Sequence, residues 1–203
     1  MRCQASSGTR PLTRVAHAAV VGGGNSTPIF AALAKQAGYR VAILTRRPAD
    51  WTTDVGFVNE GASLVDDARA LTVPKDPAYA NGQSEFRAVV DIVTSDASKC
   101  IPQSDIIFLA GVPIHHNESI LAALAKYVSK EKTVHIGSIC AYGGFNWVAS
   151  RALGPGKYNL FGTQLIPWTC GTIAYGKTGV VYGAKRMLRI AVSPPFSPRC
   201  LKN

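Results

Sequence analysis

The sequence VVGGGNSTPIF, residues 20–30, decides the fold, because in it a short apolar run meets three consecutive glycines. The apolar residues 15–21 predict a buried parallel strand, and the glycines predict a tight turn at its end. We expect a helix to begin directly after the turn, with Ser26 or Thr27 as its cap and Gly38 as its stop. The stretch is therefore typical of a strand, a turn and a helix in direct succession.

A second strand completes this unit, because residues 40–44, RVAIL, form another short apolar run after the predicted helix. Together the strand, helix and strand take about thirty residues, the length expected of a parallel crossover. Strands and helices alternate along the rest of the chain, which predicts an α/β fold with a doubly wound parallel sheet. We expect further strands at 86–93, 105–111, 133–136, 160–166 and 179–182, and helices at 97–101, 117–129, 146–153 and 185–192.

The glycine turn is similar to the G-x-G-x-x-G pattern of dinucleotide-binding folds, in which the helix N-terminus and loop backbone hold a pyrophosphate. Gly22 and Gly24 match the first two glycines, whereas Thr27 stands at the third position. Its hydroxyl could bond phosphate, or its side chain could loosen the packing of helix on strand. The residues predicted to bind the pyrophosphate of an NAD(P) cofactor are Gly22, Gly23, Gly24, Asn25, Ser26 and Thr27. A glycine-rich turn without a ligand is the alternative.

The residues after the second strand point to one form of the cofactor. An NAD enzyme presents an acidic residue there to the ribose 2′-hydroxyl, whereas this chain has Thr45, Arg46 and Arg47. An arginine binds a 2′-phosphate bidentately, so we predict NADP in preference to NAD, with NAD as a possible cofactor. Two solvated arginines on a loop are the alternative.

Ligands of doubly wound sheets lie at the carboxyl ends of the strands, which selects four loops: 22–27, 45–47, 111–116 and 137–144. We expect Val112 and Pro113 beside the nicotinamide, and His116 and Cys140 at the substrate. Of His115 and His116 at most one is expected to serve, because neighbouring side chains on a loop point in different directions. Solvated histidines and a cysteine used for packing are the alternatives, and no catalytic residue is assigned.

Composition excludes several function classes. The chain has 47% hydrophobic residues and a net charge of +10, but its Lys and Arg residues are scattered and lack the interleaved aromatic residues of a nucleic-acid surface. Its apolar runs are shorter than the ~20 residues of a membrane span. The five cysteines contain no Cys-x-x-Cys pair, so no metal site or disulfide framework is expected, and the cytoplasm is favoured, although the basic N-terminus leaves organelle targeting open.

Three stretches of the chain resemble the opine dehydrogenases, the octopine and nopaline dehydrogenase group. They are VGGGNST at 21–27, SDIIFLAGVP at 104–113, and QLIPWTC at 164–170 leading through YGK to VYGAK at 181–185. The resemblance implies a Rossmann-type NAD(P)-binding domain and an oxidoreductase that condenses an amino acid reductively with an α-keto acid. The family commonly has Arg after the cysteine of the third stretch, where this chain has Gly171, which leaves any anion contact at that point unsupported.

The resemblance also implies a missing part. In the family a helical domain follows the cofactor domain and supplies the principal catalytic histidine, whereas here a proline-rich segment without helical spacing follows residue 192. We expect a disordered extension at 1–14, an NAD(P)-binding Rossmann domain at 15–192 and an irregular tail at 193–203, with the C-terminal helical domain absent. Such a chain would bind the cofactor with little or no turnover. A noncatalytic NADP-binding or regulatory module is the alternative function.

Overall fold

The computed structural model describes residues 15–60, 85–185 and 187–193. The predicted N-terminal extension and all but the first residue of the predicted tail lie outside these ranges. The described helices are α1 (Ser26–Gln36), α3 (Asn117–Ala125) and α4 (Phe145–Leu153), with short 3-10 helices η1 (Pro48–Asp50), η2 (Ala97–Lys99) and η3 (Ile114–His116). The helices predicted at 117–129 and 146–153 correspond to α3 and α4, so both are confirmed.

The larger of two sheets has seven strands, and the chain reverses its direction of winding in the middle of it. From edge to edge the strands are β11 (Ile190–Ser193), β8 (Tyr158–Thr163), β7 (Val134–Ser138), β6 (Ile106–Leu109), β1 (His17–Val21), β2 (Arg40–Leu44) and β5 (Ile92–Thr94). All neighbours pair in parallel except β11, which is antiparallel to β8. The predicted doubly wound sheet is confirmed, and its switch point lies between β1 and β6.

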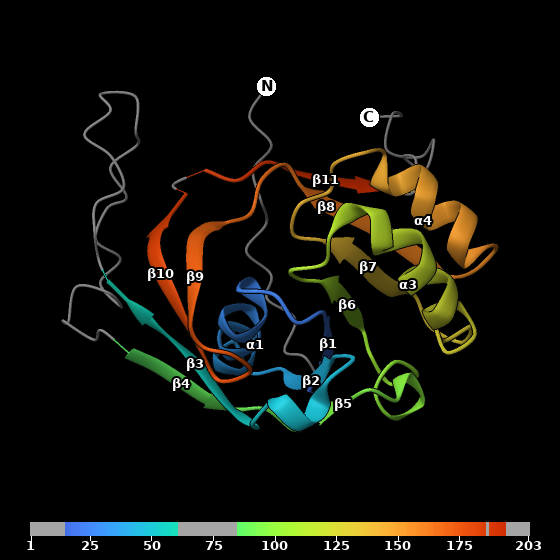
Figure 1. Ribbon diagram of the computed structural model, residues 1–203. Coiled ribbons are helices and arrows are strands. Elements are labelled where there is room, and N and C mark those ends of the chain that lie inside the picture. The colour runs from blue at the N-terminus through green and yellow to red at the C-terminus, as the bar shows by residue number, and fades with distance from the viewer. Residues whose placement is uncertain (1–14, 61–84, 186, 194–203) are drawn as a thin grey trace.

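A second sheet packs on the other side of α1. Its strands are, in order, β4 (Glu85–Val89), β3 (Asp54–Asn59), β10 (Thr178–Ala184) and β9 (Trp168–Ala174). Helix α1 lies between the two sheets, and α3 and α4 cover the opposite face of the larger one (Figure 1). The buried side chains of Ile29 and Ala32 fill the space between α1 and the second sheet, where they meet Phe57, Phe86 and Val181. Burial of these apolar side chains fixes the second sheet beside the glycine turn.

The beginning of α1 differs in one respect from the sequence expectation. Asn25, rather than Ser26 or Thr27, is the N-cap residue, and no side chain caps the helix. Thr27 is fully buried, and its hydroxyl donates to the carbonyl of Ala110 at 2.9 Å. The capping prediction is wrong because this hydroxyl bonds the residue that follows β6 instead of the helix's own backbone.

The strand predicted at 86–93 is two strands, and they belong to different sheets. The chain leaves β4 at Val89 and enters β5 at Ile92, and Asp91 fixes the bend between them. Its carboxylate accepts hydrogen bonds from the N–H of Val41 and from the Nζ of Lys35, both at 2.7 Å. The mostly apolar residues 86–93 concealed this change of sheet, because hydropathy alone does not register a bend.

The helix predicted at 185–192 is wrong, since Ile190–Ser193 form the edge strand β11, antiparallel to β8. The side chains of Ile190 and Val192 are exposed, which a helical spacing of buried residues does not anticipate. Strand β9 was not predicted at all, although its β-branched Thr172 and Ile173 are typical of a strand. Its pairing with β10 carries two register shifts, which interrupt any regular alternation.

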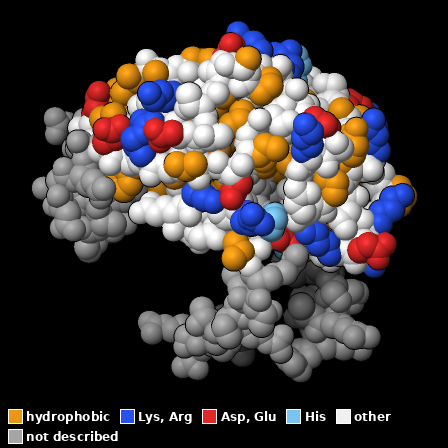
Figure 2. All heavy atoms as spheres, turned by 90° about the horizontal axis from the view of Figure 1, so that it is seen from below, with side chains coloured by type: hydrophobic (Ala, Val, Ile, Leu, Met, Phe, Trp, Pro, Cys, Tyr) orange, Lys and Arg blue, Asp and Glu red, His pale blue; other side chains and the backbone are white. Residues whose placement is uncertain are grey.

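Several large apolar side chains are exposed, among them Ile173 of β9 and Ile190 and Val192 of β11. On the face shown in Figure 2, Lys and Arg side chains are interspersed with acidic and apolar ones and form no single basic patch. Among the residues that the structure describes, no helix has the length and apolar character needed to span a bilayer.

Candidate cofactor site

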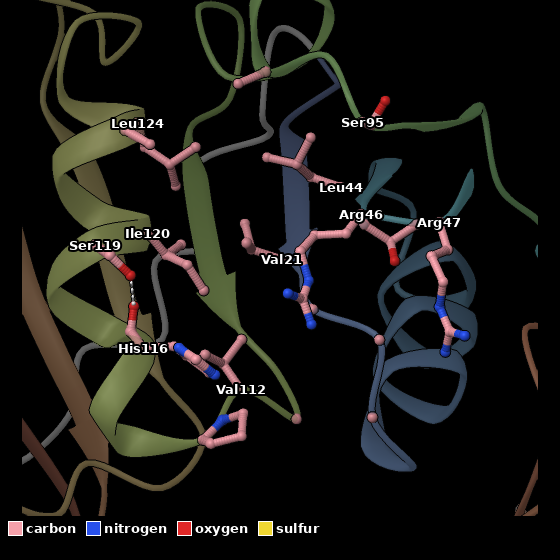
Figure 3. Close-up of a pocket in the computed structure, with 18 of the residues that line it drawn as sticks. Val21, Leu44, Arg46, Arg47, Ser95, Val112, His116, Ser119, Ile120 and Leu124 are labelled. Atoms are coloured by element: carbon pink, nitrogen blue, oxygen red, sulfur yellow. Dashed lines mark hydrogen bonds between the residues drawn. The ribbon is translucent and has the colours of Figure 1, made fainter.

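A cavity of about 1000 Å³ lies at the carboxyl ends of β1, β2, β5 and β6, the switch point of the larger sheet. Its lining includes the segments 22–24, 45–47, 95–97 and 111–113 and one face of α3 (Figure 3). Three of the four predicted loops thus meet here, whereas 137–144 does not line the cavity. The segment 95–97 was not among the predicted loops, although the strand predicted at 86–93 leads directly into it.

Gly22 makes the tight turn between β1 and the loop. Its φ is +141°, and its N–H donates to the carbonyl of Leu44 at 3.0 Å. A β-carbon at this position would overlap the carbonyl oxygen of Ala110, at the end of β6. The residue is therefore glycine because the loop passes directly between the ends of neighbouring strands.

Gly24 and Gly111 touch each other backbone to backbone, which joins the loops on the two sides of the switch point. A β-carbon on Gly24 would lie 2.8 Å from the carbonyl oxygen of Gly111 and 2.9 Å from its Cα. Gly111 has a φ of +66°, and a β-carbon there would lie 2.7 Å from the Cα of Gly24. We expected Gly24 to be small for the approach of a pyrophosphate, but the neighbouring loop already requires it. An aspartate at this position would collide with Gly111 whether or not a ligand is bound.

Gly23 forms the floor of a polar recess in the cavity. The space that its side chain would occupy is faced by the hydroxyl of Tyr175 at 3.1 Å and the Oγ1 of Thr45 at 3.3 Å. Within the described ranges, the N–H groups of Gly23 and Gly24 donate no hydrogen bond. Two hydroxyls, two N–H groups and the N-terminus of α1 suit an anionic group such as a phosphate. The residues present therefore fit the pyrophosphate of a dinucleotide.

The remaining residues of the predicted phosphate loop do not line the cavity. The Oδ1 of Asn25 accepts a hydrogen bond from the hydroxyl of Thr172 at 2.7 Å, which ties the loop to β9. Ser26 and Thr27 are buried, 3% and 0% exposed, against the sheet. Their side chains position the helix, and the N–H of Thr27 donates to the carbonyl of Gly24 at 3.0 Å.

The two arginines after β2 have different surroundings. In Figure 3 the guanidinium of Arg46 turns inward beside Val21, whereas that of Arg47 projects to the other side of the loop. Arg47 lies 4.8 Å from the ring centroid of Tyr175 and 3.4 Å from a carboxylate oxygen of Asp50. Tyr175 first, and Asp50 to a lesser extent, raise the pKa of this guanidinium. Arg46 forms no ion pair with any described residue and is available to an anionic ligand.

The other end of the cavity is formed by Val112, Pro113 and His116 together with apolar residues of α3. The rings of His115 and His116 lie side by side, with centroids 4.0 Å apart, so the expectation that they point in different directions is wrong. Only His116 of the two lines the cavity. Its backbone carbonyl accepts a hydrogen bond from the hydroxyl of Ser119 at 3.0 Å, which fixes the start of α3 (Figure 3).

Asp96 lines the cavity at the carboxyl end of β5. Its carboxylate caps η2, accepting hydrogen bonds from the N–H of Ser98 at 3.0 Å and from its hydroxyl at 2.6 Å. These two bonds lower the pKa of Asp96. A fixed negative charge therefore stands at this end of the cavity.

Cys140 was predicted at the substrate, and the structure places it outside the lining of the cavity. Its N–H donates to the Oγ of Ser138 at 3.3 Å, and burial raises the pKa of its thiol. Burial likewise raises the pKa of Cys170. Neither thiol is set up as a thiolate nucleophile. Among the described residues no group of three His, Cys, Asp or Glu could hold a metal ion.

The chain resembles known proteins over a larger part of its length in fold than in sequence. The sequence matches no protein-family model. It is 26% identical over 103 residues to an uncharacterized protein of Sinorhizobium fredii, y4xO, a match that covers 50% of this chain and 27% of that protein. The chain thus spans about a quarter of this relative.

The similarity to solved structures covers more of the chain than the sequence match does. Octopine dehydrogenase, in a structure with NADH and L-arginine, superposes with a TM-score of 0.72 at 21% identity over 88% of this chain and 42% of its own. Yersinopine dehydrogenase gives 0.62 at 14% identity over 87% and 40%. A ketopantoate reductase of the PanE/ApbA family from Ralstonia eutropha gives 0.51 at 13% identity over 82% and 46%. The chain therefore spans less than half of each, and such identities establish a common fold.

Octopine and yersinopine dehydrogenases are thus structural neighbours of this chain, which shares with them the Rossmann-type α/β fold that its sequence resemblance implied.

Proposed function

We propose that the cavity binds NADP, with the pyrophosphate on the backbone of Gly22, Gly23 and Gly24. The observation that carries this proposal is the polar recess above Gly23, which the hydroxyls of Tyr175 and Thr45 face. The recess lies next to the N-terminus of α1, and dinucleotide folds use this position for a pyrophosphate. The octopine dehydrogenase structures contain NADH, which supports a nicotinamide dinucleotide as the ligand.

The preference for NADP over NAD is proposed from Arg46 and Arg47. At the end of β2 a carboxylate would bond the ribose 2′-hydroxyl and repel a 2′-phosphate, and this chain has none among residues 45–47. Arg46 is without an ionic partner among the described residues and faces the cavity in Figure 3. Its guanidinium can therefore bind a 2′-phosphate bidentately.

The reaction class is proposed from the structural neighbours. We propose an oxidoreductase of opine dehydrogenase type, which condenses an amino acid with an α-keto acid; octopine dehydrogenase structures hold L-arginine or pyruvate with NADH. The bound cofactor would supply the hydride. Val112 and Pro113 would shape the pocket of the nicotinamide ring, and His116 would offer an imidazole to a substrate carbonyl.

Binding without appreciable turnover is expected of the 203-residue chain. Among the described residues, the cavity offers a single imidazole, and the segment 111–116 holds no arginine that could bind a substrate carboxylate. The free thiols of Cys100, Cys140 and Cys170 agree with a reducing compartment, for which we propose the cytoplasm.

The test is a fluorescence titration of the chain with NADPH and with NADH at fixed ionic strength. We expect saturable binding of both, with the higher affinity for NADPH. Equal or tighter binding of NADH would refute the assignment of the arginines, and lack of binding by either would refute the cofactor site.

A further inference from the structure

We infer that Tyr175, contributed by the second sheet, is the positioning residue that holds Arg47 for the 2′-phosphate of NADP. The inference rests on the proposed function and adds to it a specificity element outside the glycine loop. Tyr175 lies in the turn between β9 and β10, about 150 residues after Gly23, and it lines the cavity. Tyr175 belongs to the YGK of the third stretch that resembles the opine dehydrogenases, and the glycine pattern of dinucleotide-binding folds does not include it.

The turn that carries Tyr175 is fixed to the segment after β2. Gly176 has a φ of +69°, and a β-carbon there would overlap the carbonyl of Asp50. The carbonyl of Gly176 accepts a hydrogen bond from the N–H of Thr52 at 3.1 Å, and the N–H of Lys177 closes the turn on Ala174 at 3.1 Å. Because the backbones meet this closely, the position of the Tyr175 side chain is set before any ligand binds.

The ring of Tyr175 has two neighbours that define its orientation. It meets the buried indole of Trp51 edge to face, with centroids 5.8 Å apart and planes at 71°. On Arg47 the guanidinium carbon lies 4.8 Å from the ring centroid, within the range of a cation–π contact. Asp50 holds the Nε of the same guanidinium at 3.4 Å. Arg47 is thereby restrained from two directions, although 66% of its side chain is exposed.

This restraint determines what the arginine can do. An unrestrained arginine loses much side-chain entropy when it binds a phosphate, and preorganisation removes part of that cost. The Asp50 carboxylate approaches the guanidinium at Nε, and a bidentate phosphate contact needs only two of the remaining N–H groups. The ring therefore favours NADP selectively, because NAD has no 2′-phosphate on its adenosine ribose for Arg47 to bind.

The hydroxyl of Tyr175 has a separate place in the site. It faces the recess above Gly23 together with the hydroxyl of Thr45, where it would meet a group common to both dinucleotides. Loss of the hydroxyl alone should therefore affect NADPH and NADH equally. Only loss of the ring should change the ratio of the NADPH and NADH affinities.

The experiment compares NADPH and NADH affinities of the chain and four variants by fluorescence titration. In Tyr175→Leu we expect the NADPH affinity to fall about five- to tenfold more than the NADH affinity, and in Tyr175→Phe we expect the wild-type ratio of the two affinities to return. Arg47→Ala should lower NADPH affinity about tenfold, and adding Tyr175→Leu to it should change the ratio of the NADPH and NADH affinities by less than about twofold, because the ring acts through the arginine.

A matched control is Tyr182→Leu, on β10 of the same hairpin, since Tyr182 is 38% exposed against 42% for Tyr175 and does not line the cavity. An unchanged affinity ratio in Tyr175→Leu, an equal loss in the control, or full additivity with Arg47→Ala would overturn the inference alone. Equal binding of NADPH and NADH by the wild-type chain would overturn it and leave dinucleotide binding in place. Binding of neither dinucleotide would overturn the proposed function as well.

Discussion

Replacing Gly111 by alanine should destabilise the chain and open the cofactor site, because the two glycine loops touch. The new β-carbon would lie 2.7 Å from the Cα of Gly24 and 3.0 Å from its nitrogen, closer than nonbonded atoms allow. Since both neighbours are backbone atoms, relief requires the loops to separate. Overpacking of this kind costs about 1–3 kcal/mol, and the left-handed φ of +66° adds about 1–2 kcal/mol for a residue with a β-carbon.

Gly38→Ala separates these two contributions. Gly38 also has a left-handed φ, +88°, but a β-carbon there meets nothing within 4 Å. The control should lose only the backbone contribution, so that Gly111→Ala unfolds with a free energy lower than the control's by about 1–3 kcal/mol, a Tm difference of roughly 3–9 °C for a chain of this size. Urea denaturation and calorimetry measure the difference, and NADPH affinity should fall in Gly111→Ala only. Equal stability of the two variants would show that the loops do not touch as described.

Two further predictions concern single side chains. Arg46→Ala should lower the NADPH affinity about tenfold and leave NADH nearly unchanged, whereas Arg40→Ala, at the opposite end of β2, should alter neither affinity; parallel titrations check both, and a matching loss for NADH would contradict the role of Arg46. Burial raises the pKa of the Cys100 thiol from 9.0 to about 11, so its contribution to stability is complete below pH 9 and is lost as the pH rises through 11. Between pH 8 and 10.5 the free energy of unfolding should therefore fall by about 2 kcal/mol more in the wild-type chain than in Cys100→Ala, and an equal fall in urea titrations of both would contradict this.

The sequence predicted the strand, turn and helix around Gly22 and Gly24 because this information is local. An apolar run, three glycines and a helical spacing of apolar residues each specify the conformation of their own segment. The doubly wound parallel sheet followed from the alternation of strands and helices, whereas the order of its strands was not predicted. The loops that meet at the cavity were predicted largely through the same rule.

What the sequence did not predict depends on contacts between distant segments. The bend at Asp91 is held by Lys35 and by the N–H of Val41, far away in the chain, and no local pattern encodes it. Tyr175 enters the cavity only because β9 and β10 form a second sheet behind α1. The edge strand at Ile190 was mistaken for a helix, because a short segment with exposed apolar residues carries no burial pattern to distinguish the two.

Gly24 shows that a motif position can require glycine for more than one reason. The expected reason was the approach of a pyrophosphate, and the structure supplies a second reason in Gly111. A substitution at Gly24 would therefore weaken binding even if the phosphate lay elsewhere. Gly23 offers a better probe, since a β-carbon there meets only the two hydroxyl oxygens of Tyr175 and Thr45, at 3.1 and 3.3 Å.

The measurement that tests the central claim most directly is the NADPH affinity of Gly23→Asp against Gly23→Asn, with melting curves of both. The two side chains have the same size, so they differ only in a negative charge within the recess. Two charges about 6 Å apart repel by roughly 3 kcal/mol at an effective dielectric constant near 20, and solvent at the open cavity reduces this. With the pyrophosphate on this loop, the aspartate variant should bind NADPH at least about tenfold more weakly at equal Tm. Equal affinities would place the pyrophosphate somewhere other than the glycine loop.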